Sequence, residues 1–433
     1  MKARGAEAYT AFIPKFAMPR APGPLWRKAM RQLKGKAVVA QGGGPTAVIN
    51  QSLVGLVMEA RKWRYITNVY GARFGVQGIV NEDFLDLSQT TTHNLEMVAS
   101  SPSSALGSTR VKPDKAYCAR MVEVFKRHGV RYFFYIGGND SAETCHIVAE
   151  YAREVDYELR VIHIPKTIDN DLAVTDHCPG FGSAARFVTS AFACLDMDNF
   201  AIPGVFIGVV MGRHAGWLTA SSVMARRDPK DGPHLIYVPE RVFDTERFLG
   251  DVERVFTANG RCVIALSEGI VGADGKPVLT HLQGETEMDP FGNLQLSGRG
   301  TLGDALSDAI KQRLGIKRVR CDTFGYLQRS FLGVISDSDS SEARDVGETA
   351  VHFAFNRQMD GSVAIRRTGD YSVDYFLTPL STVAARTKLL PPVYLKGDHD
   401  IDESFRDYAR PLIGTIPHFD RIIAPRVEPL GPA

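Results

Sequence analysis

The segment 165–171, with the sequence Pro-Lys-Thr-Ile-Asp-Asn-Asp, carries the side chains of this chain that are best suited to chemistry. It follows the apolar run 161–164, which predicts a buried strand, and α/β sheets bind ligands at the carboxyl ends of their strands. Asp169 and Asp171 offer a proton acceptor and a metal ligand, while Lys166 offers a positive charge to a phosphate. Phosphoryl transfer to a hydroxyl group needs such a set. An acidic turn that caps a helix is the alternative interpretation.

Four other segments repeat the order of a short apolar strand followed by glycine or polar residues. These segments span residues 36–46, 132–141, 205–213 and 262–269. Helical patterns alternate with the strands, which predicts an α/β fold with largely parallel sheets. Because parallel strands end at the same edge of a sheet, we expect the polar turns to lie close together.

Two of these turns contain glycine pairs that suit phosphate binding. Gly43 and Gly44 let backbone N–H groups approach a phosphate because no Cβ intervenes. The turn is not a Walker A loop, since no Gly-Lys-Ser/Thr closes it. In the second turn Gly138 opens the site, and Asn139 and Asp140 can hold a metal–phosphate group. A structural turn and a helix cap, respectively, are the alternatives.

Several arginines complete the candidate set. Arg213, at the end of a predicted strand, can stabilise negative charge that grows on a transferring phosphoryl group. Arg110, Arg320 and Arg329 supply further cations, and Tyr326 supplies a hydroxyl group. Taken singly, each arginine also fits a solvated surface charge or an ion pair.

The composition narrows the class of protein. A chain of 433 residues with 44% hydrophobic and 23% charged residues is typical of a globular protein with two or three lobes. A net charge of +2 argues against nucleic-acid binding by bulk electrostatics, and no apolar run approaches the ~20 residues of a membrane span. The six cysteines form no CxxC pair, which favours free thiols in a reducing, cytoplasmic compartment.

Two segments depart from the α/β pattern. Residues 1–35 are basic, with one acidic residue and four prolines, and they contain no serine and no long apolar core. This composition argues against a secretory signal, and the lack of serine disfavours an organellar transit peptide. It favours a basic extension that packs on a partner subunit or is disordered. Glycines and a proline punctuate residues 271–300, which predicts a hairpin-like insertion.

Taken together, the motifs resemble those of the phosphofructokinase family over roughly residues 36–350. They occur in that family's order at positions 43–44, 107–110, 137–140, 165–171, 211–213, 267–269 and 325–329. The resemblance implies two Rossmann-like α/β lobes, with largely parallel sheets flanked by helices and an active site in the cleft between them. The expected divisions are a 1–35 extension, a phosphoryl-donor lobe over 36–180 with part of 328–380, a sugar-phosphate lobe over 181–327, and a 381–433 C-terminal segment.

The resemblance also implies a role for each motif. Asp169 is similar to the base that accepts the proton of the 1-hydroxyl of fructose 6-phosphate, with Thr167 beside it, and Asp171 and Asp140 are the expected Mg²⁺ site. Arg213 and Arg110 are the expected cations around the phosphoryl group. The expected sugar-phosphate residues are Thr167, Asp169, Met211, Gly212, Arg213, Glu268, Arg320, Tyr326 and Arg329.

Two positions indicate the phosphoryl donor. Asp140 and Lys166 stand where ATP-using members typically carry glycine, and this is the pattern of the pyrophosphate-dependent members. A carboxylate at position 140 would repel the α-phosphate of a nucleotide, and an ammonium at 166 would bind a pyrophosphate oxygen. The alternatives are sedoheptulose 7-phosphate as a major acceptor, ATP as donor, or a regulatory subunit that has lost catalysis.

The chain also departs from the family pattern. Asn139 replaces the usual aspartate that helps to hold Mg²⁺, and Gly204 replaces the arginine that reaches the sugar phosphate from a neighbouring subunit. No nucleotide effector site is evident, so we expect weak or no regulation. The resemblance implies a homodimer or homotetramer, with fructose 6-phosphate and pyrophosphate as substrates and neither a nucleic acid nor a membrane as a partner.

Overall fold

A computed structural model describes residues 32–282, 301–357, 359–417 and 420–428. The predicted basic extension therefore lies almost wholly outside the described residues, as does most of the predicted insertion. Its described beginning is a tight turn, in which Val271 pairs antiparallel with Pro277. Within these ranges, no helix has the length and apolar character that crossing a membrane requires.

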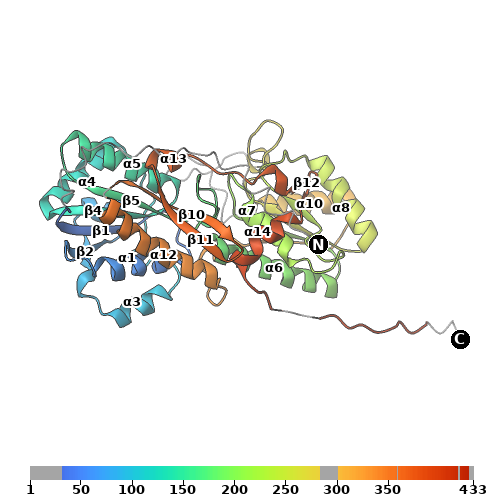
Figure 1. Cartoon of the computed structure of the whole chain (residues 1–433). Helices are drawn as coiled ribbons and strands as arrows, with labels where there is room; N and C mark the ends of the chain where they lie inside the picture. Colours follow the sequence, from blue (N-terminus) through green and yellow to red (C-terminus); the bar gives the residue numbers. More distant parts are fainter. Residues whose placement is uncertain (1–31, 283–300, 358, 418–419, 429–433) are drawn as a thin grey trace. The chain divides into compact units, whose positions relative to one another are not determined.

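The first sheet has seven strands in the order β11-β10-β5-β4-β1-β2-β3 (Figure 1). Its central strands are parallel, and β3 and β11 join antiparallel at the two edges. The strands of this sheet are β1 (Gly35–Gln41), β2 (Ile66–Ala72), β3 (Phe84–Asp86), β4 (Val130–Gly137), β5 (Arg160–Pro165), β10 (Gly361–Gly369) and β11 (Ser372–Thr378).

The second sheet has four strands, all parallel, in the order β7-β8-β6-β9. These are β6 (Val205–Val210), β7 (Leu235–Tyr237), β8 (Cys262–Ser267) and β9 (Val319–Thr323). A separate antiparallel pair consists of β12 (Leu395–Lys396) and β13 (Asp400–Ile401). The prediction of an α/β fold with two mostly parallel sheets is confirmed, while the lobe boundaries stay predictions.

Helices cover both faces of each sheet. The α-helices are α1 (Ile49–Ala60), α2 (Val76–Val80), α3 (Thr92–Ala99), α4 (Lys115–His128), α5 (Asn139–Glu154), α6 (Phe181–Ala201), α7 (Trp217–Ala220), α8 (Thr245–Asn259), α9 (Leu279–Leu282), α10 (Thr301–Leu314), α11 (Leu327–Ser330), α12 (Asp337–His352), α13 (Leu380–Val383) and α14 (Ser404–Ile413). Short 3-10 turns are η3 (Leu87–Gln89), η4 (Ser221–Ala225) and η6 (Pro392–Tyr394), and η5 (Phe353–Arg357) is a π-helical turn.

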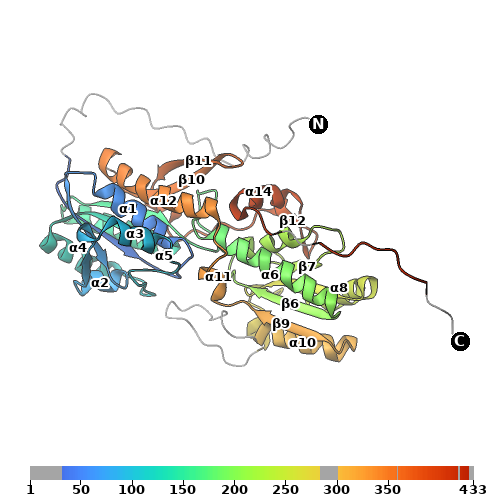
Figure 2. The same ribbon diagram turned by 90° about the horizontal axis from the view of Figure 1, so that it is seen from below.

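Each sheet separates two apolar layers. On the first sheet, α4 and α5 pack on one face, and α1 pairs with α12 on the other. On the second sheet, α6 and α14 cover one face and α8 and α10 the other, as Figure 2 shows for α6 and α10. Because both faces are covered, the central strands are continuous apolar runs such as Val205–Val210, which is buried throughout.

The helices that follow the strands have clear ends. Asp114 caps α4 by accepting a hydrogen bond from Tyr117 N at 2.7 Å, and Gly129 ends that helix in the left-handed conformation. Ser336 caps α12 in the same way as Asp114 caps α4. These capping residues define where the helices begin and end. The polar turns at the carboxyl ends of β1, β4, β5, β6 and β8 lie outside the helices and can form a site.

Candidate active site

The loop after β5 places the two aspartates of the segment 165–171 under unusual constraint. Asn170 between them is fully buried and has a left-handed φ of 56°. Its Nδ2 donates to the Tyr408 hydroxyl at 2.8 Å, and its Oδ1 accepts from Cys178 N at 3.0 Å. Asparagine tolerates this conformation better than most residues. The loop geometry is therefore built around Asn170, and it fixes where Asp169 and Asp171 leave the backbone.

Thr167 contacts both aspartates. Its Oγ1 accepts a hydrogen bond from Asp169 N at 3.1 Å, and a hydrogen bond from its side chain favours the ionised form of Asp171, which lowers that pKa. Burial outweighs this effect, and the nearby charge of Asp169 adds to burial, so that the pKa of Asp171 is raised to about 7. Two like charges on one buried loop thus make Asp171 ready to take a cation.

The loop after β1 contacts the loop after β5. Lys166 is buried, and its Nζ donates to Gly44 O at 2.7 Å. Gly43 has a φ of 74°, and a Cβ at this position would lie 3.3 Å from Lys166 Nζ, so a side chain here would be strained. Burial, followed by the positive charges of Arg329 and Arg110, lowers the pKa of Lys166 to about 7.

The segment 107–110 supports this glycine turn. Ser108 Oγ donates to Gly43 O at 2.6 Å, and Gly43 N donates to Thr109 O at 3.2 Å. Arg110 next to them is exposed, and its charge reaches both Lys166 and Arg329. Arg110 therefore belongs to the same electropositive region as Lys166.

Arg329 connects the second sheet to the turn that contains Gly43 and Gly44. It lies on α11, which follows β9, and a Cβ on Gly44 would lie 2.9 Å from its Cζ. The guanidinium also lies over the ring of Tyr326, 4.8 Å from the centroid, while Tyr326 itself is exposed. The loops of the two sheets thus meet where Gly44 faces Arg329, as the sequence predicts for a site between two lobes.

Asp169 faces the cations of both sheets. Burial raises its pKa, and the charges of Arg329, Arg213 and Lys166 act in the opposite direction. His214 adds a smaller effect in that same direction. It was not among the predicted site residues, because a single histidine after an arginine forms no recognisable motif. A carboxylate among cations stays available as a proton acceptor.

The loop after β6 is held by backbone contacts that leave no room for larger residues. Gly212 has a φ of 143°, and its carbonyl accepts from Ser267 Oγ at 2.7 Å. Glu268 is buried, and its backbone N–H donates to Val210 O at 2.9 Å. A Cβ on Gly269 would lie 2.1 Å from Arg213 O. The 211–213 and 267–269 motifs are therefore adjacent, which puts Arg213 and Glu268 on one side of the site.

Gln328, which lies in the 325–329 motif but was assigned no role there, connects Arg329 to this loop. Its side chain is buried, accepts from Met211 N at 3.2 Å and donates to Gly325 O at 3.0 Å. Met211 is itself buried in the core under α6. The short helix that carries Arg329 is thus fixed against the 211–213 motif.

The turn after β4 separates its two polar residues. Asn139 Nδ2 donates to Asp171 Oδ2 at 3.2 Å, and within the described residues its buried Oδ1 has no hydrogen-bond partner. Asp140 is exposed and lies 3.3 Å from Lys112 Nζ. Gly138 lies close to the backbone of Lys166, since a Cβ there would be 3.8 Å from Lys166 O.

The contacts of the metal-site candidates favour Asn139 as the partner of Asp171. No group of three or more histidine, cysteine, aspartate or glutamate side chains among the described residues could hold a metal ion. Asn139, whose Nδ2 contacts the Asp171 carboxylate, nevertheless has an uncommitted Oδ1. Together, this amide oxygen and the carboxylate of Asp171 are hard oxygen ligands, which suit a divalent ion such as Mg²⁺. The role of Asp140 as a metal ligand stays a prediction.

Arg320 is the predicted site residue that the chain does not bring to the others. It is exposed on β9, level with Phe206 near the start of β6, and its Nη1 donates to the neighbouring Val319 O at 3.1 Å. The site lies at the opposite, carboxyl ends of these strands. A sugar-phosphate role for Arg320 stays a prediction that its contacts within one chain do not support.

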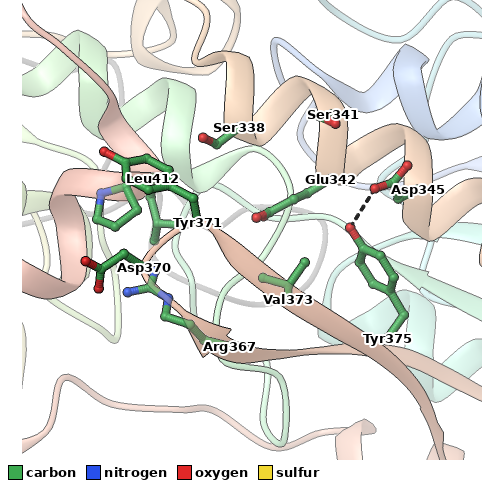
Figure 3. Close-up of a pocket in the computed structure, with 11 residues that line it drawn as sticks. Ser338, Ser341, Glu342, Asp345, Arg367, Asp370, Tyr371, Val373, Tyr375 and Leu412 are labelled. Atoms are coloured by element: carbon green, nitrogen blue, oxygen red, sulfur yellow. Dashed lines mark hydrogen bonds between the residues drawn. The ribbon is translucent and has the colours of Figure 1, made fainter. Parts of the chain in front are cut away.

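A hollow of about 250 Å³ lies elsewhere, between α12, the β10–β11 hairpin and α14 (Figure 3). Glu342, Arg367 and Tyr375 are among its lining residues, and the Tyr375 hydroxyl donates to Asp345 Oδ2 at 3.0 Å. Within the described part of the chain, its lining includes none of the predicted site residues. The hollow therefore lies apart from the site formed by the strand ends.

Comparisons with known proteins agree with the geometry. The sequence model described as "Phosphofructokinase" matches residues 36–354. The chain is 60% identical over 382 residues to a pyrophosphate–fructose 6-phosphate 1-phosphotransferase of Rhodospirillum rubrum, covering 88% of this chain and 95% of that one. A protein of the same name from Xanthomonas campestris is 41% identical over 391 residues, with 88% and 91% coverage.

A solved structure is also similar. The crystal structure of a pyrophosphate-dependent phosphofructokinase from Marinobacter aquaeolei matches with a TM-score of 0.78 and 34% sequence identity. The match covers 89% of this chain and 94% of the other chain. The likeness thus extends over most of the chain.

Proposed function

The chain belongs to the phosphofructokinase family, and we infer that it transfers a phosphoryl group from pyrophosphate to the 1-hydroxyl of fructose 6-phosphate. Relatives named for this reaction, at 60% and 41% identity, support the assignment. The products are fructose 1,6-bisphosphate and phosphate. Because donor and product have similar phosphoryl-transfer potential, we propose that the reaction runs in both directions, in glycolysis and in gluconeogenesis.

We propose roles for the site residues that follow from their positions. Asp169 accepts the proton of the 1-hydroxyl group, and the hydroxyl oxygen attacks the terminal phosphorus of pyrophosphate. The bond between that phosphorus and the bridging oxygen breaks. Arg213 stabilises the charge on the moving phosphoryl group. Lys166, held at the glycine turn, binds the phosphate that leaves. Arg329 and Glu268 hold the sugar phosphate from the second sheet.

Family members generally use a divalent metal, and we propose Mg²⁺ for this chain. Asp171 and Asn139 would hold it, since the Asn139 Oδ1 is buried and uncommitted within the described residues. A metal ion at such a site neutralises charge on the phosphoryl oxygens when it is bound. The hydrogen bonds of Thr167 and Asn170 orient the loop that carries Asp171.

Replacing Asn139 with aspartate should strengthen Mg²⁺ binding. A second carboxylate beside Asp171 is a stronger Mg²⁺ ligand than an amide, so we expect the half-saturating Mg²⁺ concentration to fall by roughly tenfold, about 1.4 kcal/mol. The rate measured against Mg²⁺ concentration tests this. Asp140→Asn is the matched control, because Asp140 faces Lys112. A larger Mg²⁺ effect for the control would assign the metal to Asp140.

The buried ammonium of Lys166 is the observation that carries the choice of donor. Initial rates with fructose 6-phosphate and Mg²⁺, with pyrophosphate or ATP at equal concentration, test it. We expect activity with pyrophosphate and at most about 1% of that rate with ATP. Poorer charge complementarity with ATP that raises the activation free energy by about 2.7 kcal/mol would lower the rate a hundredfold. Activity with ATP alone would contradict the donor assignment.

The acceptor range is a separate question, and one more methylene or hydroxyl group changes pocket fit only modestly. The same assay with sedoheptulose 7-phosphate measures it. We further propose a homodimer or homotetramer, on family resemblance, and a cytoplasmic location. All six cysteines are free and four of them are buried, which supports a reducing compartment.

A further inference from the structure

A lysine of the C-terminal segment contacts the loop that carries Asp169 and Asp171. Lys388 lies between α13 and η6, beyond residues 36–354, which the family sequence model matches. It was not singled out in the sequence, because no motif surrounds it. Its contacts, however, all converge on the loop that carries Asp169 and Asp171 and on one residue of the second sheet's helical layer.

The backbone of this segment pairs with the loop. Lys388 N donates to Asp171 O at 2.6 Å, and Thr387 forms an antiparallel bridge with Leu172. These contacts hold the main chain of Asp171, while Asn139 contacts its carboxylate. The position of a proposed metal ligand therefore depends on a segment more than 200 residues away in the sequence.

The side chain of Lys388 extends the attachment. Its Nζ donates to Thr175 O at 3.0 Å and to Asp176 O at 2.7 Å, so one ammonium closes the turn that follows Asp171. The ammonium also lies 4.9 Å from the centre of the Trp217 ring. Trp217 is buried, and its Nε1 donates to Lys388 O at 3.1 Å.

Tyr408 on α14 reinforces the same loop. Its hydroxyl accepts from Asn170 Nδ2 at 2.8 Å and donates to Asp176 O at 3.0 Å. Its ring lies 5.2 Å from that of Trp217. The C-terminal segment thus holds the loop 170–176 at two places, while Trp217 connects both places to the second sheet.

We propose that Lys388 is a positioning residue for phosphoryl transfer, which holds the Asp169–Asp171 loop in register with the cations of the second sheet. This inference rests on the proposed function. Lys388 contacts backbone oxygens of the loop, so it acts through Asp171 rather than on a substrate. A displacement of about 1 Å at a reacting group can lower a rate by roughly a hundredfold, which sets the scale of the expected effect.

The test compares Lys388→Met, which keeps the length but loses the donors and the charge, with Lys388→Arg, which keeps both. We expect kcat to fall by roughly 10- to 100-fold in Lys388→Met, with the KM for fructose 6-phosphate changed by less than about threefold, and Lys388→Arg to recover most of the rate. Lys396→Met is the control, because Lys396 is exposed in the same segment. A lower melting temperature with unchanged kcat would make Lys388 merely structural and overturn the proposal.

Hydrogen exchange of peptides that cover residues 166–178 gives a readout that needs no activity. Faster exchange there in Lys388→Met, with β1 and β4 unchanged, supports the positioning role, and unchanged exchange contradicts it. If wild-type protein lacks activity with pyrophosphate, the proposed function fails while the exchange result still decides the role of Lys388. Should Lys388→Met not fold, Trp217→Phe, which removes the Nε1 donor to Lys388 O and leaves a smaller ring in this buried position, should cause a smaller loss of kcat, and no loss would overturn the proposal.

Discussion

Replacing Asp169 with asparagine should lower kcat by roughly 10²- to 10⁴-fold, the range that general-base catalysis contributes. Asparagine keeps the shape of the side chain but cannot accept the hydroxyl proton. The charges of Arg329, Arg213 and Lys166 all act on the Asp169 carboxylate, so it is a proton acceptor placed among the proposed phosphoryl-binding cations. Steady-state rates at saturating pyrophosphate measure the effect, and calorimetric titration with fructose 6-phosphate should show nearly unchanged affinity.

A matched control separates this effect from a general loss of structure. Asp360 is a largely buried aspartate whose Oδ1 accepts from Val161 N at 2.9 Å, at the start of β5, whereas Asp169 lies beyond the end of that strand. Asp360→Asn should lower the melting temperature and leave the kcat of the folded fraction unchanged. Near-normal turnover in Asp169→Asn would remove this residue from the mechanism.

The strands were predictable because their burial leaves a strong signal. The apolar runs 36–40, 132–136 and 205–210 correspond to β1, β4 and β6 within about two residues. Strands that are partly exposed have a weaker hydrophobic pattern and were harder to predict. In β10 the first five residues are buried and the later ones, such as Arg366, are largely exposed, while in β11 exposed residues such as Asp374 alternate with partly buried ones. The resemblance assigned part of 328–380 to the first lobe.

The turns at the strand ends were predictable, but the orientation of the side chains in them was not. Asn139 and Asp140 are consecutive in the first turn of α5, and successive helical side chains point about 100° apart. One therefore faces Asp171 and the other faces Lys112. A list of motif residues cannot make this distinction, because it depends on where the helix begins and how it packs on β5.

Replacing Lys166 with methionine should lower kcat/KM for pyrophosphate by roughly 30- to 1000-fold. The loss corresponds to about 2–4 kcal/mol, the scale of one charged donor removed from a water-poor site. Lys166 is buried at Gly44 O, where methionine keeps the packing and removes the charge. Lys112→Met is the control, because Lys112 is half-exposed and pairs with Asp140 and Glu143. If the KM values of pyrophosphate and fructose 6-phosphate rose equally, the donor-site assignment would be wrong.

The pH dependence gives Lys166 a second signature. Burial and the charges of Arg329 and Arg110 lower its pKa to about 7, so the free enzyme loses this cation as the pH rises through 7. We expect kcat/KM for pyrophosphate to fall above that pH in wild type. Asp171, whose pKa burial raises to about 7, has the opposite sign, because its useful ionised form is gained as the pH rises. Lys166→Met should therefore lose the falling limb and keep the rising one, and a falling limb that survives the substitution would belong to another group.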